Sequence, residues 1–523
     1  MRKTKNIGGR FIMNIKQAKA EIIHTVQAYL QKDEDGFYQI PVIRQRPILL
    51  MGPPGIGKTQ IMEQVARECK IGLVSYTITH HTRQSAVGLP MIKEEVYQGE
   101  KYTITEYTMS EIIASIYRTM EETGLTEGLL FIDEINCVSE TLAPTMLQFL
   151  QCKTFGNEKV PEGWIIVAAG NPPEFNKSVR EFDMVTMDRL RYIPIEADWN
   201  VWKEYAMTVR VHPAVLSYLS LRPQNFYRIE NDIDGMQFVT ARGWEDLSNF
   251  MQVYETLGIE IKEEIIHEFL QHEEAAKDFA AYLDLYQKYQ DDYGIEDILN
   301  GKVAAALYRR IEHAPFDERL SVVHLLISGL NSFFYQVSVE KQLTDEWYEF
   351  LKEYRERLKS SEDFIEEYQN LYKEREVQIE LAKKENFYTR EEVKLHQRLL
   401  KKLAEAIPDT IALGKCSKQE CFDLAKASFD VQAECLSRIE EAAQQALEYA
   451  FDFMENAFEN GQELVIFVTE LASGLYSALF LTSHECVRYL KYSRKLLMDE
   501  QKEQLVLELS MNEIHKKEHI RNL

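Results

Sequence analysis

The feature that most constrains this chain is a glycine-rich octet between an apolar run and an amphipathic segment. The octet, Gly-Pro-Pro-Gly-Ile-Gly-Lys-Thr, occupies residues 52–59, after Pro47–Met51 and before Gln60–Cys69. The spacing G-x-x-x-x-G-K-T, in a strand–loop–helix context, is that of a phosphate-binding loop. Its glycines let backbone N–H groups converge on phosphate oxygens, and the helix N-terminus adds a partial positive charge.

The octet predicts ATP as the ligand and Mg²⁺ as the cofactor. Lys58 is expected to neutralise the β- and γ-phosphates, and the Thr59 hydroxyl to bind Mg²⁺. A glycine-rich turn with an unrelated lysine is the alternative, and the matching strand and helix argue against it. The residues predicted to contact the nucleotide are Gly52, Pro53, Pro54, Gly55, Ile56, Gly57, Lys58, Thr59 and Gln60.

Two carboxylates follow a second apolar run. Leu129–Ile132 has the composition of a buried strand, and Asp133 and Glu134 come directly after it. In α/β sheets the carboxyl ends of the strands are where ligands bind. Taken singly, this pattern is common and indicates only the end of a strand. After the glycine-rich octet it predicts Asp133 as a second Mg²⁺ ligand and Glu134 as the base that activates water.

A third apolar run ends in a polar amide. Ile165–Ala169 is followed by Gly170, Asn171 and Pro172. An asparagine before proline is ordinarily a turn former. One strand after the carboxylate pair, Asn171 is instead expected to hydrogen-bond the γ-phosphate or the attacking water.

The pattern of apolar residues divides the chain into several regions. Short apolar runs alternate with amphipathic helices over residues 13–198, which predicts an α/β domain with a parallel sheet. The predicted strands are Pro47–Met51, Leu73–Ile78, Leu129–Ile132, Ile165–Ala169 and Tyr192–Ile195. Residues 199–276 are expected to form a helical lid, interrupted near Asp232–Gly235, and residues 277–523 a mostly α-helical region for assembly or partner binding. Residues 1–12 are expected to be disordered or to precede an alternative start at Met13.

Two apolar segments mark the helical region. The first is a seam at three- and four-residue spacing, which predicts a long helix packed on a neighbour; it indicates either a coiled coil within residues 343–400 or an amphipathic helix in a bundle. Its members are Trp347, Leu351, Tyr354, Leu358, Ile365, Tyr368, Tyr372 and Ile379. The second, Leu464–Thr482, contains Glu470 at mid-span, which favours a buried helix over a membrane span.

The bulk composition favours a cytoplasmic protein that is not primarily a nucleic-acid binder. The formal net charge is −24, whereas binding to a phosphate backbone favours a basic face. The seven cysteines include no C-x-x-C pair, so reduced thiols are expected rather than a disulfide framework. No apolar segment follows the basic N-terminus, which argues against a signal peptide.

Together these motifs resemble the Walker A, Walker B and sensor 1 elements of the MoxR-type AAA+ ATPases, in the branch with the dynein-related and midasin-like modules. The resemblance covers residues 13–275 and implies an α/β P-loop NTPase (AAA+) core with a small helical lid. It also implies that Arg189, in Met187-Asp188-Arg189-Leu190, is the arginine finger offered to a neighbouring subunit. Arg191 is a rival for this role, and either arginine could instead form a surface ion pair.

Two further segments resemble elements of this family. Thr240-Ala241-Arg242-Gly243-Trp244 is similar to the lid motif, which implies that Arg242 is sensor 2; a solvated charge at a helix terminus is the alternative. Gly88-Leu89-Pro90 and a predicted hairpin, Met91–Tyr97 with Tyr102–Tyr107 turning at Gln98-Gly99, resemble the helix-2 insert, with which family members contact substrate or partner. Ile40–Ile43 is expected either to line the adenine site or to belong to the core.

The resemblance implies an ATP-driven, chaperone-like remodelling motor. A finger acting in trans requires a neighbouring subunit, so a closed hexameric ring is expected. The family also implies a protein partner with a von Willebrand factor A (VWA) domain. The alternatives are a nucleotide-gated scaffold in which hydrolysis is incidental and a nucleic-acid motor, which the acidic composition disfavours.

Overall fold

The chain divides into two compact units. The computed structural model describes residues 5–7, 10–80, 88–155, 158–175, 182–232, 235–359, 364–406, 418–459 and 461–496. The first unit, called the α/β unit, comprises residues 1–202, 226–244 and 374–394. The second, called the helical unit, comprises residues 203–225, 245–373 and 395–523. Each unit is thus assembled from three separate stretches of chain.

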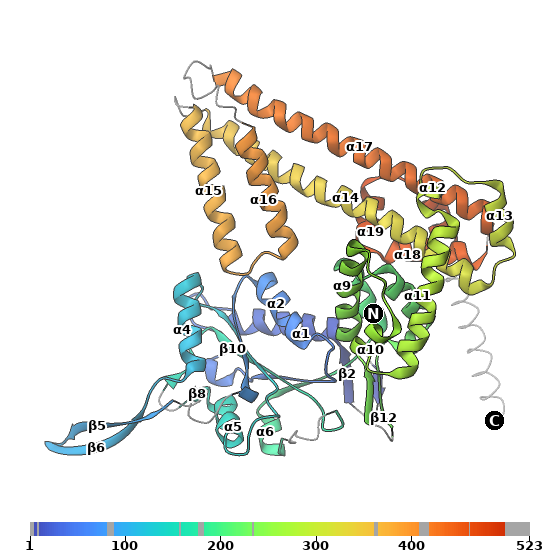
Figure 1. Cartoon of the computed structure of the whole chain (residues 1–523). Helices are drawn as coiled ribbons and strands as arrows, with labels where there is room; N and C mark the ends of the chain where they lie inside the picture. The colour runs from blue at the N-terminus through green and yellow to red at the C-terminus, as the bar shows by residue number, and fades with distance from the viewer. Residues whose placement is uncertain are drawn as a thin grey trace, which may run out of the picture. The chain divides into compact units, whose positions relative to one another are not determined.

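A mostly parallel sheet forms the centre of the α/β unit (Figure 1). Its strand order is β1-β2-β11-β3-β10-β7-β4, and only the β1–β2 pair is antiparallel. All five predicted strands are present, which confirms the α/β prediction. They are β3 (Ile48–Met51), β4 (Gly72–Thr77), β7 (Gly128–Asp133), β10 (Trp164–Gly170) and β11 (Arg191–Glu196).

Helices cover both faces of this sheet because successive side chains of a strand point to opposite faces. In β7, Leu129 and Phe131 belong to one apolar cluster, which includes residues of α1 (Ile15–Leu30) and α2 (Lys58–Cys69). Leu130 and Ile132 belong to the other, with residues of α4 (Glu111–Thr123) and α5 (Ala143–Cys152). Burying each such side chain contributes about 1.5–3 kcal/mol.

The N-terminal segment forms two strands. β1 (Lys5–Ile7) and β2 (Arg10–Asn14) pair with each other, and Met13 of β2 pairs with Ile195 of β11. Asn14 then begins α1 through a capping box with Gln17. Strands therefore occupy part of residues 1–12, for which we expected disorder or an alternative start.

The predicted hairpin is confirmed. β5 (Pro90–Tyr97) pairs with β6 (Glu100–Tyr107) over their whole length. Gln98 and Gly99 form the turn with φ of 52° and 89°, as a tight two-residue hairpin turn requires. The hairpin projects away from the sheet (Figure 1), and Ile92 and Val96 are 81% and 62% exposed.

Several short elements complete the first two stretches of the α/β unit, and one of them was not expected. β12 (Arg228–Asp232) pairs antiparallel with β13 (Gly235–Val239), so part of the predicted helical lid is a β-hairpin. Its two strands lie on either side of the region near Asp232–Gly235 where the helical pattern was expected to break. The other elements are η1 (Val42–Arg44), η2 (Ile78–His80), β8 (Thr154–Phe155), β9 (Glu158–Lys159), α6 (Met184–Asp188) and α7 (Trp199–Thr208), which extends into the helical unit.

The helical unit contains the long helices of the chain. Helix α9 (Ala241–Leu257) begins in the α/β unit and continues here, and residues 487–496 are also helical. The remaining elements are α8 (Pro213–Leu221), η3 (Pro223–Asn225), α10 (Glu263–Phe269), α11 (Glu273–Tyr293), α12 (Ile295–Leu299), α13 (Ala305–Glu312), α14 (Phe316–Arg357), α15 (Phe364–Lys384), α16 (Arg390–Glu405), α17 (Lys418–Phe458), α18 (Gln462–Ser473) and α19 (Leu475–Ser483). Of these, α15 ends and α16 begins within residues 374–394 of the α/β unit. These helices agree with the predicted helical C-terminal region.

The lid helices pack with helices that follow Ala276. The Tyr218 ring of α8 lies 5.1 Å from the Phe279 ring and 5.5 Å from the Tyr282 ring of α11. Ser217 also hydrogen-bonds to His324 of α14 at 2.8 Å. No break in packing therefore coincides with the predicted boundary at residue 276.

The apolar seam is divided between two helices, which corrects the prediction of one long helix. α14 ends at Arg357 and α15 begins at Phe364. The rings of Tyr354 and Tyr368, both seam residues, meet edge to face at 5.1 Å. Residues of α16 and α17 belong to the same cluster, so the seam packs against several helices. A three-and-four spacing specifies a buried face, but it does not specify where the chain turns.

The other apolar segment is also broken. Leu464–Thr482 falls on α18 and α19, which meet at an angle of 85°. By length and composition alone α14 could cross a membrane, and α18 with α19 could do so only as one bent span. Buried core helices of soluble proteins pass the same test, so this is weak evidence for a span.

Candidate functional site

The glycine-rich octet joins β3 to α2 at the carboxyl edge of the sheet. β3 lies between β10 and β11, the two strands of this sheet that come last along the chain. After β3 the chain adds strands on one side of it, and β11 is then added on the other side. In α/β sheets, ligands bind at the point where the strand order reverses in this way. Gly55 and Gly57 have φ of 71° and 91°, a backbone conformation that favours glycine. Gly57 provides no side-chain cap for α2, so N–H groups of its first turn have no side-chain acceptor and suit an anion.

Lys58 reaches back across this loop. Its Nζ donates to the carbonyls of Gly52 at 2.8 Å and Pro53 at 2.9 Å, and to Oδ1 of Asn171 at 2.8 Å. Burial lowers the pKa of the Lys58 ammonium to about 8; the charge of Asp133 opposes this shift, and that of Arg242 adds to it. The lysine and the predicted sensor amide are therefore in direct contact.

The two predicted Mg²⁺ ligands lie together. The Thr59 hydroxyl donates to Oδ2 of Asp133 at 2.9 Å. A hydroxyl and a carboxylate are the hard oxygen ligands that Mg²⁺ prefers, and Mg²⁺ sites in proteins usually combine one or two carboxylates with substrate phosphates. The residues present therefore fit this ion.

Glu134 begins the turn that follows β7. Its φ of 57° lies in the left-handed region, which costs a residue with a side chain about 1–3 kcal/mol and is concentrated at functional sites. The Glu134 N–H donates to Oδ1 of Asp133 at 2.9 Å, so both Asp133 oxygens have partners. The half-buried Glu134 carboxylate lies in the same turn.

Arg242 lies beside the glycine-rich loop. Its N–H donates to the Gly55 carbonyl at 3.2 Å, and the Tyr227 hydroxyl donates to the Pro54 carbonyl at 2.8 Å. Arg242 is exposed at the start of α9, and its charge contributes to the lowered pKa of Lys58. The structure thus brings the predicted sensor 2 arginine to the loop through backbone contacts.

The two candidate finger arginines differ in their surroundings. Arg191 in β11 forms an ion pair with Glu21 at 2.5 Å and donates to the Thr25 hydroxyl at 2.6 Å, both on α1. Arg189 ends α6, is exposed, and donates to Oε1 of Gln151 on α5. Arg191 is therefore held within its own subunit, and Arg189 is the more accessible of the two.

The remaining predicted contacts are spread around the loop. Ile56 is buried among α1 and α2 residues, whereas Gln60 is exposed on α2. In the segment considered for the adenine ring, Ile40 packs against this same cluster and Ile43 is 90% exposed. The Val42 carbonyl accepts a hydrogen bond from Lys153 Nζ at 2.7 Å.

Sequence reasoning missed three residues that contact the backbone or side chains of the predicted site residues. Tyr227 and Gln151 carry no pattern that points to the loop or to Arg189. Asn136, two residues after Glu134, hydrogen-bonds the backbone of Asn171. The only sequence signal for Asn136 was its position as a short polar residue close to the carboxylate pair.

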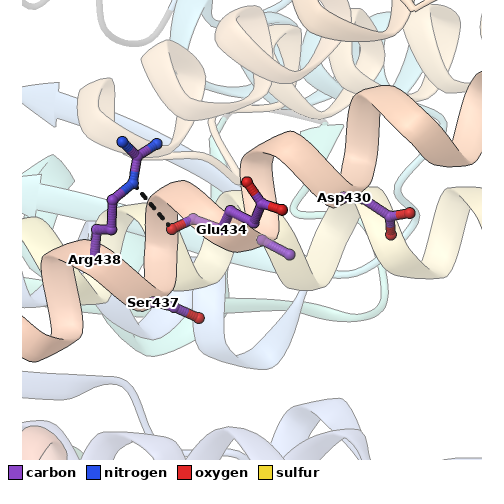
Figure 2. A pocket seen from close by; sticks show the side chains of 5 residues that line it. Asp430, Glu434, Ser437 and Arg438 are labelled. Carbon is purple, nitrogen blue, oxygen red and sulfur yellow. Dashed lines mark hydrogen bonds between the residues drawn. The ribbon is translucent and has the colours of Figure 1, made fainter.

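A second concave region lies on α17, away from these residues in the sequence. Figure 2 shows that the side chains lining it come from this one helix, and the Arg438 Nε donates to the Glu434 carbonyl at 3.4 Å. It is shallow and its side chains do not converge. Within the described residues, no group of three or more His, Cys, Asp or Glu could hold a metal ion.

The fold and this site define an α/β protein with a P-loop nucleotide site. Residues 48–189 match the family model of the ATPase family associated with various cellular activities (AAA). This match covers β3 to Arg189 and supports an AAA+ ATPase. Among curated proteins, none matches the chain.

Proposed function

We propose that the chain is a Mg-ATP-hydrolysing motor of the MoxR type that remodels a protein partner in the cytoplasm. One observation carries the proposal: Lys58, the Thr59–Asp133 pair and Asn171 converge at one edge of the sheet. Glu134 follows Asp133 in the same turn. This combination provides charge neutralisation, oxygen ligands for Mg²⁺ and a candidate base within one small site.

Each residue has a distinct role in the proposed reaction. Lys58 neutralises the β- and γ-phosphates, and Thr59 and Asp133 hold Mg²⁺. When held by Thr59 and Asp133, Mg²⁺ would supply Lewis-acid polarisation of the phosphoryl oxygens. Glu134 orients the attacking water and accepts its proton. The Asn171 amide hydrogen-bonds the γ-phosphate or that water, and Arg242 binds phosphate from the other side of the loop.

A ring is proposed because the family resemblance implies an arginine finger that acts in trans, in addition to Lys58 and Arg242. Arg189 would supply this finger to the neighbouring subunit. Its surroundings support such a contact: Met184 and Val185 on α6 are 85% and 59% exposed. Apolar side chains of this size beside an accessible arginine suit a surface that another copy covers. We propose a hexamer as the closed form.

The partner is proposed to be a VWA-domain protein, on the family resemblance. The β5–β6 hairpin offers a surface for such a contact, since an isolated two-stranded ribbon with exposed apolar residues has no core of its own. The helical unit is proposed to mediate assembly or partner binding. A scaffold with incidental hydrolysis and a nucleic-acid motor remain the alternatives to be tested.

Two substitutions test the proposal. Lys58→Ala should abolish nucleotide binding, because the loop loses its cation. Glu134→Gln should keep binding but reduce turnover roughly 10²- to 10⁴-fold, because the amide cannot accept a proton. Equilibrium titration with a fluorescent ATP analogue and a phosphate-release assay measure the two effects, with the exposed Lys159→Ala as the control.

The same assays separate the alternatives. Binding without Mg²⁺-dependent turnover in the wild type would favour the scaffold. Stimulation by DNA, but not by a VWA-domain protein, would favour the nucleic-acid motor. If Glu134→Gln binds as weakly as Lys58→Ala, the role given to Glu134 is wrong.

A further inference from the structure

The buried amide of Asn136 satisfies both backbone groups of Asn171. Asn136 is 2% exposed. Its Nδ2 donates to the Asn171 carbonyl at 2.8 Å, and its Oδ1 accepts from the Asn171 N–H at 3.3 Å. A carboxamide offers one acceptor and a donor, the same pair that a backbone peptide group offers. The Asn136 side chain therefore makes the two hydrogen bonds that a neighbouring strand would make to Asn171, beyond the point where β7 ends.

These contacts fix the backbone of Asn171, whose side chain contacts Lys58 of the phosphate loop. β7 and β10 are paired up to Ile132 and Ala168, and Asn171 lies just beyond the end of β10. Within the described residues, the hydrogen bonds to the Asn171 backbone both come from Asn136. The Asn171 side chain accepts from Lys58 Nζ at 2.8 Å. Any shift of this backbone would therefore move the amide relative to Lys58.

Gly170 allows the close approach of the Asn136 amide. A Cβ at position 170 would lie 2.5 Å from Oδ1 of Asn136, much closer than nonbonded atoms approach. The Gly170 carbonyl also accepts from the Gly52 N–H at 3.3 Å. Gly170 thus contacts the first residue of the phosphate loop while leaving space for the amide that holds the next residue.

We propose that Asn136 is a positioning residue that holds Asn171 in register with Lys58 during ATP hydrolysis. Asn136 and Glu134 belong to the same turn, so one rigid segment sets both the base and the sensor amide. The role rests on the proposed ATPase function, because Asn171 acts on the γ-phosphate or the attacking water. Asn136 itself touches neither.

The central test is the split between kcat and KM. Asn136→Ala should lower kcat roughly 10- to 100-fold, the range expected when a buried backbone group loses its hydrogen bond and the reacting geometry shifts. The KM for Mg-ATP should change much less, because Lys58 and the loop remain. Asn136→Asp keeps the shape but places a carboxylate oxygen against the Asn171 carbonyl, so it should also be slow.

Double variants then show whether Asn136 acts through its neighbours. Asn136→Ala should add little further loss in an Asn171→Ala background, because the side chain that it positions is gone. Gly170→Ala should be slow alone but should add little to Asn136→Ala, which removes the clashing amide. Single-turnover hydrolysis keeps the slow variants measurable.

Asn225→Ala provides the matched control. Asn225 is also a buried asparagine, and it donates to the Tyr218 hydroxyl at 2.7 Å in the helical unit. This variant should lower thermal stability without changing kcat. Wild-type kcat in Asn136→Ala or Asn136→Asp, or full additivity with Asn171→Ala, would overturn the positioning role while the ATPase function stands. A wild type without Mg²⁺-dependent turnover would remove both.

Discussion

The sequence of the α/β unit and the sequence of the helical unit predict their structures in different ways. In the α/β unit, function-bearing residues follow directly on strands, and the backbone at Gly55, Gly57 and Glu134 is held in left-handed conformations. Such local requirements limit which residues can occur, so a short motif specifies a geometry. In the helical unit, the same kind of apolar spacing recurs along helices as long as α14 and α17.

The difference shows what each kind of pattern can specify. The octet at residues 52–59 determines its own loop because Gly55 and Gly57 adopt positive φ and Lys58 donates to carbonyls of the loop itself. The seam at Trp347–Ile379 determines only which side chains are buried, and several helices could cover it. We therefore expect ATP hydrolysis to depend on individual polar groups of the α/β unit. We expect the stability of the helical unit to depend on how completely buried side chains fill its core.

The largest effect should come from Arg189. Arg189→Ala should reduce hydrolysis about 10³- to 10⁵-fold in assembled protein and leave ATP affinity nearly unchanged, because the proposed finger would contact the neighbour's γ-phosphoryl group. A phosphate-release assay and nucleotide titration measure this pair of effects. Mixing Arg189→Ala with Lys58→Ala subunits should restore some activity, since mixed rings contain complete sites.

Arg191→Ala is the matched control for that prediction. Its partners Glu21 and Thr25 lie on α1 of the same chain, so this variant should lose stability rather than turnover. Absence of recovery in mixed rings, with subunit exchange demonstrated, would contradict a finger that acts in trans. A larger loss of turnover in Arg191→Ala would assign the role to Arg191.

A packing change in the helical unit should have a smaller, purely structural effect. Phe350 is fully buried, and its ring meets the Tyr368 ring at 5.1 Å. Phe350→Ala should lower the free energy of unfolding by about 3–5 kcal/mol through the cavity it creates. Hydrogen exchange should increase in peptides from α14 to α16, and ATP affinity should stay unchanged.

The exposed Tyr348 supplies the comparison, since its side chain is 55% exposed on the same helix. Tyr348→Ala should change stability little. Equal destabilisation by both variants would show that cavity formation is not the cause. Loss of nucleotide binding in Phe350→Ala would show that the units are energetically coupled and would break the comparison.

The smallest effect should be a pH dependence confined to the α/β unit. Burial lowers the pKa of Lys153 to about 8 from its usual value near 10.5. Between these values the unfolded chain binds more protons than the folded chain, so the free energy of unfolding rises with pH. The total gain is at most roughly 3 kcal/mol, from the size of the pKa shift.

Lys153→Met removes this dependence. Urea unfolding at pH 7.5 and pH 9.5, read by hydrogen exchange of peptides from α5, should show wild type gaining stability relative to Lys153→Met at the higher pH. The exposed Lys159→Met should show no such difference. A wild type that loses stability relative to Lys153→Met across this interval would contradict the buried, low-pKa lysine.

Much of the fold and site was predictable because strands and phosphate loops leave strong local patterns. Apolar runs, and the polar or glycine residues that end them, predict the five strands and the β5–β6 hairpin. The same pattern predicts the convergence of Lys58, Asp133 and Asn171. Tyr227, Gln151 and Asn136 were missed because hydrogen bonds to distant backbone or side chains require no recurring spacing. The end of α14 at Arg357 was missed because apolar residues at three- and four-residue spacing resume in α15.

The position of β3 in the sheet has a consequence for synthesis on the ribosome. Its only neighbours are β10 and β11, which begin at Trp164 and Arg191. The apolar segment Ile48–Met51 therefore leaves the ribosome long before either pairing strand exists. At about 5–20 residues per second, this interval lasts roughly 10 seconds. During that time an unpaired apolar strand is available for wrong pairing, and early binding by a cellular chaperone would protect the nascent chain.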